Sequence, residues 1–111
     1  MPLLKRARIE VYLPDKPRKP IYRRLRKAFE QEFLQTFGGA TVIKDIKGLY
    51  LSSTDKIDTD KINLIYTETP FDFDKHFEAL STYTDELRQS ALEASEEESI
   101  LIVVHQIYHS I

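Results

Sequence analysis

Residues 7–39 read ARIEVYLPDKPRKPIYRRLRKAFEQEFLQTFGG. Apolar and polar side chains alternate over residues 7–13, which predicts a strand with two unlike faces. Three prolines at positions 14, 17 and 20 then exclude regular structure, because each lacks a backbone donor and restricts the residue before it. Apolar residues next recur at three- and four-residue steps, so a helix is predicted from Pro20 to Phe37, with Gly38-Gly39 ending it. This stretch is therefore a strand, an extended loop and a helix.

The rest of the chain predicts two strands, a second helix and a last strand. The expected bounds are strands over residues 41–51, 61–68 and 99–108, a polar turn over 52–60, and a helix capped by Asp72 or Asp74. The first of these strands is interrupted by polar and glycine residues, and we expect Gly48 to be its bend. The last strand is apolar on both faces, which predicts cover on both.

The order strand, helix, strand, strand, helix, strand is that of a split βαβ arrangement. It predicts an α+β, ferredoxin-like βαββαβ sandwich, in which two helices cover one face of a four-stranded antiparallel sheet. One domain over residues 1–111 accommodates these elements. The motifs Phe-Gly-Gly at 37–39, Gly-Leu-Tyr at 48–50 and Ile-Leu-Ile-Val-Val at 100–104 follow an order that resembles many small ferredoxin-like bacterial proteins. No functional position follows from this resemblance.

In this topology one sheet face has no helix of the same chain over it. We expect the helices to cover Ile9, Val11, Leu13, Ile62, Leu64 and Tyr66. The open face is then expected to carry Arg8, Glu10, Tyr12, Asn63, Ile65 and Thr67. A partly apolar face of this kind predicts association with another molecule, because it would otherwise be an exposed patch.

Composition excludes several classes of protein. The 111 residues contain no Cys, so disulfides and thiolate metal sites are excluded, and no apolar run is long enough to span a membrane. No signal-peptide pattern follows the first charged residues, so we expect a cytoplasmic protein. No glycine loop or ligand spacing indicates a metal or another cofactor, and we expect neither.

The small net charge of −2 conceals a strong asymmetry. The first 27 residues contain ten Lys and Arg but only two acidic residues, a net of +8, whereas the other 84 residues contain six basic and 16 acidic ones, a net of −10. The candidate polyanion- or partner-binding residues are Lys16, Arg18, Lys19, Arg23, Arg24 and Lys27. They would contact either a nucleic-acid backbone or an acidic protein partner. The acidic remainder would repel a polyanion, so protein association is the preferred interpretation.

A small-ligand site is the other alternative, and the sequence leaves open whether such a site would be enzymatic. Its candidate residues are Tyr12, Tyr66, His105 and Tyr108, which offer aromatic rings with polar tips and one imidazole. The preferred hypothesis is a cytoplasmic partner-binding module without catalytic machinery that forms a homo-oligomer, with a dimer as the first expectation. A nucleic-acid surface over residues 16–27 is the second alternative.

Overall fold

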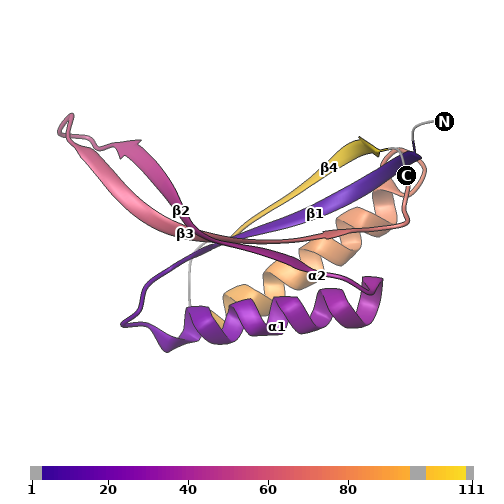
Figure 1. Ribbon diagram of the computed structural model, residues 1–111, viewed down its shortest axis with the longest axis horizontal. Coiled ribbons are helices and arrows are strands. Elements are labelled where there is room, and N and C mark those ends of the chain that lie inside the picture. Colours follow the sequence, from indigo (N-terminus) through magenta and orange to yellow (C-terminus); the bar gives the residue numbers. More distant parts are fainter. Residues whose placement is uncertain (1–3, 96–99, 110–111) are drawn as a thin grey trace.

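The computed structural model describes residues 4–95 and 100–109. The elements are β1 (Leu4–Pro14), α1 (Pro20–Phe37), β2 (Thr41–Leu51), β3 (Ile57–Glu68), α2 (Phe77–Ser95) and β4 (Leu101–His109). The strands form an antiparallel sheet in the order β2-β3-β1-β4, and both helices lie on the same side of it (Figure 1). This is a ferredoxin-like α+β fold, as the order of the predicted elements indicates.

The core lies between the sheet and the helices. Alternate residues of β1 enter it, so that Ile9, Val11 and Leu13 are at most 1% exposed. Helix α1 contributes Phe29 and Phe33 on one face, as the three- and four-residue spacing predicts. Burying a side chain of this size stabilises the fold by about 1.5–3 kcal/mol, so these residues fix α1 against the sheet.

The predicted orientation of β3 is wrong. Residues directly opposite each other on paired strands share a face, and Ile9, Val11 and Leu13 pair with Thr67, Ile65 and Asn63. The alternation of apolar residues favoured the other orientation, but the two polar residues have partners on the helix side. Thr67 donates a hydrogen bond to the Gly39 carbonyl at 2.7 Å, and Asn63 accepts one from the Asp45 amide at 3.3 Å. Ile62, Leu64 and Tyr66 therefore lie on the open face, and Asn63, Ile65 and Thr67 do not.

The irregularity of β2 lies at Asp45 and not at Gly48. The register of β2 against β3 shifts between Ile43 and Ile46, and Asp45 has a positive φ of 64°. Aspartate tolerates this left-handed conformation better than most residues. Gly48 instead pairs regularly with Asp60. The Asn63 side chain holds the Asp45 amide, which explains why this bulge occurs without glycine.

Beyond the bulge, β2 and β3 continue as a two-stranded hairpin that projects past the helices (Figure 1). We call residues 46–62 the hairpin arm. The connecting turn is shorter than predicted, because β3 begins at Ile57 and not at Lys61. Ser52 holds this turn, since its Oγ accepts hydrogen bonds from the Thr54 and Lys56 amides.

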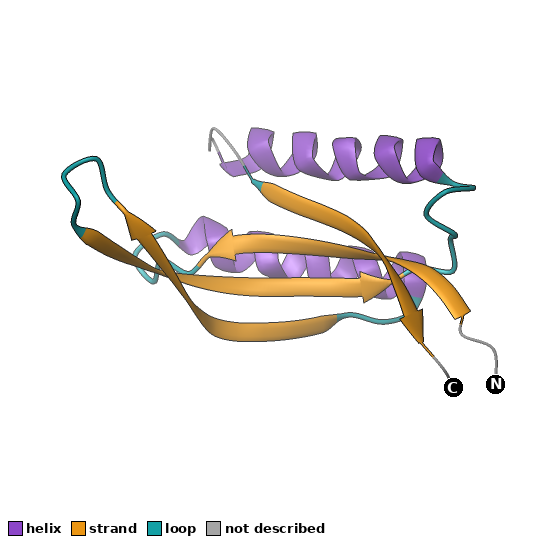
Figure 2. Cartoon of the chain, turned by 90° about the horizontal axis from the view of Figure 1, so that it is seen from above, coloured by secondary structure: helices purple, strands orange, loops and turns teal. Residues whose placement is uncertain are grey.

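Helix α2 begins at Phe77, after a turn in which the Asp72 carboxylate accepts hydrogen bonds from the Asp74 and Lys75 amides. Its buried residues are Leu80 and Ala91, whereas Phe77 at its first position is 56% exposed. Seen from above, α1 lies behind the strands, and α2 runs along the outside of β4 (Figure 2). Neither helix, within the described part of the chain, is long and apolar enough to cross a membrane.

Candidate functional site

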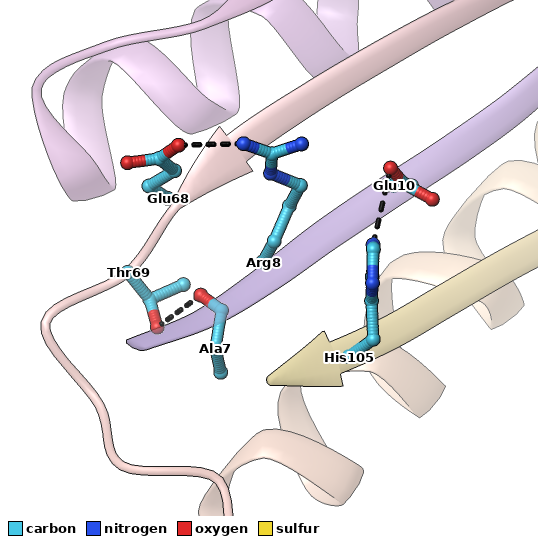
Figure 3. Close-up of polar contacts among 6 residues, drawn as sticks. All are labelled: Ala7, Arg8, Glu10, Glu68, Thr69 and His105. Carbon is cyan, nitrogen blue, oxygen red and sulfur yellow. Dashed lines mark hydrogen bonds and ion pairs between the residues drawn. The ribbon is translucent and has the colours of Figure 1, made fainter. Parts of the chain in front are cut away.

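A buried carboxylate lies on the sheet face that the two helices leave open. Glu10 of β1 is 8% exposed, and both of its side-chain oxygens have partners. The Tyr12 hydroxyl donates to Oε1 at 3.0 Å, and the His105 Nε2 lies 3.1 Å from Oε2 (Figure 3). Burial, then the hydrogen bond to Glu10 and the charge of Glu10, raise the pKa of Tyr12. Tyr12 therefore stays protonated at neutral pH and acts as a donor to the carboxylate.

A second polar group lies beside this cluster. The Arg8 Nη2 is 2.7 Å from the Glu68 Oε1 on the neighbouring strand (Figure 3). The guanidinium carbon of Arg8 also lies 4.3 Å from the centre of the Tyr66 ring, within the range of a cation–π interaction. On the open face, the acidic side chains of Glu10 and Glu68 therefore lie next to basic or polar ones. The latter are Arg8, Tyr12 and His105.

The structure brings three of the four predicted ligand residues to one face. Tyr12, Tyr66 and His105 lie around Glu10 and Arg8. Tyr66 pairs with Glu10, His105 pairs with Arg8, and Tyr12 is two residues from Glu10 on the same strand. Tyr108 lies on the opposite side, since it is an odd number of residues from His105 and pairs with Lys5. Its hydroxyl accepts a hydrogen bond from the side-chain amide Nε2 of Gln106 at 2.7 Å. Tyr108 therefore cannot join the other three residues in one site.

Exposed apolar side chains gather on the two edges of the sheet. Strand β4 exposes 58% of Leu101, and strand β2 exposes 43% of Ile43, both on the open face. The hairpin arm exposes Leu49, Leu51 and Ile57 on its other face, with Leu51 and Ile57 directly opposite each other and each 71% exposed. Apolar side chains on long, unpaired edge strands are a template for pairing with another chain.

The predicted basic residues divide into two groups. Lys16, Lys19 and Arg23 line one hollow at the start of α1, together with Arg26 of the same basic segment. Arg18, Arg24 and Lys27 are exposed and do not line it. The helical spacing of Arg23 and Arg26, three residues apart, is the signal that places these two on one side of α1.

Among residues 4–95 and 100–109, no three His, Asp or Glu side chains are placed to hold a metal ion. His105 has Glu10 as its acidic neighbour, and the His76 ring contacts the backbone of Asp72 and the Phe71 ring. The acidic residues of the open face are instead engaged by Arg8, Tyr12 and His105.

The fold defines a class of protein, the ferredoxin-like α+β domains with an open sheet face. Neither a protein-family model nor a curated protein matches this chain. Solved structures do match it. CutA1 from Oryza sativa is 17% identical with a TM-score of 0.57, and covers 98% of this chain and 85% of its own. CutA from Synechococcus elongatus PCC7942 is 14% identical with a TM-score of 0.57, at 97% and 85% coverage.

A third match is described as a divalent cation tolerance protein, Cut A1, from Thermus thermophilus. It is 13% identical with a TM-score of 0.56, and covers 94% of this chain and 84% of its own. At identities this low, the likeness establishes the shared fold alone. The function has to be argued from the surfaces of this chain.

Proposed function

We propose that this protein is a homo-oligomeric binding module, without catalytic machinery of its own, whose copies associate through the open sheet face and the sheet edges. The observation that carries this proposal is the exposure of apolar side chains along β2 and β4, the two edge strands. Both strands are long, at 11 and 9 residues, and each presents a row of backbone groups that could pair with another chain.

A second copy of the chain suits this surface better than a partner whose surface charges all have the same sign. The open face carries Arg8 and His105 beside Glu10 and Glu68, so it offers both signs of charge to a partner. A self-complementary surface needs both signs, because the same residues must face each other across the interface. The segregated charge of the chain adds a basic α1 and an acidic remainder that attract each other between copies.

The way in which the edges pair determines the number of copies. Pairing of β4 with β4 gives a closed dimer, the first expectation from the sequence. Pairing of β2 with β4 is heterologous, and it closes only as a ring of more than two copies. Both arrangements belong to the proposal, and the molar mass in solution distinguishes them.

The test is multi-angle light scattering at about 50 µM protein, where an assembly of micromolar affinity is mostly associated. Wild-type protein should have a mass at least twice that of the chain, and Leu101→Lys should shift it toward the monomer. Leu34→Lys is the matched control, because Leu34 is 46% exposed and belongs to α1, not to a strand of the sheet. A wild-type monomer at this concentration would remove the proposal.

The small-ligand alternative keeps Tyr12, Tyr66 and His105 as its candidate residues. The observation in its favour is the buried carboxylate of Glu10, which holds two of them in fixed positions. A ligand on this face would compete with the second copy of the chain. Ligand binding by the monomeric Leu101→Lys variant, lost on Tyr66→Ala, would therefore favour this alternative.

A further inference from the structure

The loop between β1 and α1 forms a pocket of about 350 Å³ with the first turns of α1. In Figure 1 this loop lies at the end of the molecule beneath the hairpin arm. The pocket is lined by Asp15, Lys16, Pro17, Lys19, Pro20, Tyr22, Arg23, Arg26 and Asn63. It is distinct from the open sheet face, because Asn63 reaches it from the helix side of β3.

Within the described part of the chain, the cations of this pocket lack acidic partners. Four of its lining residues are basic and one, Asp15, is acidic, which leaves a net charge of +3. Among residues 4–95 and 100–109, no carboxylate lies within 4.0 Å of a charged nitrogen of Lys16, Lys19, Arg23 or Arg26. Elsewhere in the described chain, Arg8 and Arg88 do have such partners. This group differs from the other cations of the chain in its place, because four basic side chains line one concave pocket with a single acidic residue.

Arg26 is the most informative of the four. Its side chain is half-buried. Its Nε atom is inaccessible to solvent and has no hydrogen-bond partner. A buried donor on a charged group is costly to leave unpaired, which is why such guanidinium groups usually have an acceptor. The interactions described for the chain supply none to Arg26. The other guanidinium nitrogens of Arg26 have no partner among the described residues either, and these are the donors that an anion in the pocket would bind.

We propose that this pocket binds a small, polyvalent phosphate-bearing anion. Two arginines and two lysines match the charge of such a ligand, and a guanidinium presents paired donors that fit phosphate oxygens. The pocket lies at the positive end of α1, whose first turn contains no acidic residue. Its volume is at the lower end of the range for small-molecule sites, which suits a compact phosphate and not a large cofactor.

A concave site distinguishes this ligand from a nucleic-acid backbone. An extended backbone would use the exposed cations along α1, which include Arg24 and Lys27, at least as much as those in the pocket. A small anion would depend on the pocket residues alone. The proposal concerns a different surface from the association of copies, so either can fail without the other.

The test is calorimetric titration of the full chain with inorganic pyrophosphate, at about 50 mM salt, where phosphate contacts are strong. Arg26→Gln and Lys19→Gln should each weaken binding at least about tenfold. The matched controls, Arg24→Gln and Lys27→Gln, remove one charge each from α1 outside the pocket and should change affinity less than about twofold. Lys19→Gln, in an exposed loop position, keeps the test valid if Arg26→Gln does not fold.

Two results would overturn the proposal. One is the absence of pyrophosphate binding to the wild-type protein. The other is equal weakening by pocket and control variants, which would indicate a diffuse electrostatic effect. A parallel titration with a single-stranded oligonucleotide separates the sources of phosphate. Stronger binding of the oligonucleotide, weakened mainly by Arg24→Gln and Lys27→Gln, would assign the basic surface to nucleic acid and not to a small anion.

Discussion

Thr69 shows how one residue closes the sheet where β3 ends. It is completely buried, and its hydroxyl donates to the Ala7 carbonyl at 2.9 Å (Figure 3). The same oxygen accepts a hydrogen bond from the Phe71 amide at 3.2 Å, and the Phe71 carbonyl accepts one from the Ala7 amide. The side chain thus extends the ladder of β1 past the last paired residue of β3, and it fixes the segment that leads to α2.

Thr69→Val should lower the free energy of unfolding by about 1–3 kcal/mol, because it keeps the volume but removes both hydrogen bonds of the hydroxyl and leaves the Phe71 amide without its acceptor. Chemical denaturation followed by circular dichroism measures this change. Thr54→Val is the control, since Thr54 is exposed in the turn of the hairpin arm and should change stability by less than about 0.5 kcal/mol. Equal effects of the two substitutions would contradict the role assigned to Thr69.

At the scale of the elements, periodicity predicted the type and order of all six. The bounds of α1 and β2 agree with the prediction to the residue, because Pro20 and Gly38-Gly39 punctuate the chain unambiguously. The face of β3 was predicted wrongly, since the row of Ile62, Leu64 and Tyr66 is the more apolar one and therefore favoured the helix side. The orientation was determined by tertiary hydrogen bonds of Asn63 and Thr67, which no local pattern reveals.

The candidate site was predictable to a similar extent. The alternation of β1 placed Arg8, Glu10 and Tyr12 on one face correctly, and His105 joined them because its strand pairs with β1. Tyr108 was included although its odd spacing from His105 excludes a shared face. The basic segment was visible in the sequence, but the division between pocket residues and exposed residues depends on how α1 is rotated against β3.

The two helices are linked by a hydrogen bond from the Tyr83 hydroxyl to the Glu32 Oε1 at 3.0 Å. Burial, followed by the hydrogen bond to Glu32, raises the pKa of Tyr83 well above its ordinary value. The folded chain therefore holds this proton more tightly than the unfolded chain. The stability that results is present below the unfolded pKa of about 10, and it is lost as the pH rises above that value toward the folded pKa.

We expect the wild-type protein to lose more stability than Tyr83→Phe between about pH 8 and about pH 10.5, because only the wild type has this proton to lose. At about pH 8 the variant should be less stable by about 1 kcal/mol, through loss of one hydrogen bond. Denaturation midpoints at the two pH values test this, with Tyr50→Phe, exposed on the hairpin arm, as the control. A difference between wild type and Tyr83→Phe that stays constant with pH would contradict the explanation.

At the scale of the whole molecule, the charge asymmetry has a structural basis. The basic first quarter of the sequence supplies β1, the proline-containing loop and the outer surface of α1, with Leu25 and Phe29 of the same helix in the core. It is therefore part of the folded domain and not a separate tail. The basic pocket lies apart from the open face and its apolar edges, so the proposed association of copies and the proposed binding of an anion use separate surfaces.

The hairpin arm provides the sharpest test of association, because its apolar side chains make little contact with the rest of the chain. Leu51 and Ile57 are each 71% exposed and face each other across the two strands. Replacing both with Thr keeps residues that favour strands and can pair across them. The free energy of unfolding of the isolated subunit should then change by less than about 0.5 kcal/mol.

If the arm contacts another copy, the double variant loses apolar area at the interface, and its dissociation constant should rise at least about tenfold. Sedimentation velocity over a range of protein concentrations measures this shift. Leu34→Gln serves as the control, since it removes an exposed apolar side chain of similar size from α1. Loss of association in both variants would point to general surface hydrophobicity, and loss in neither would restrict the interface to the open sheet face and the β4 edge.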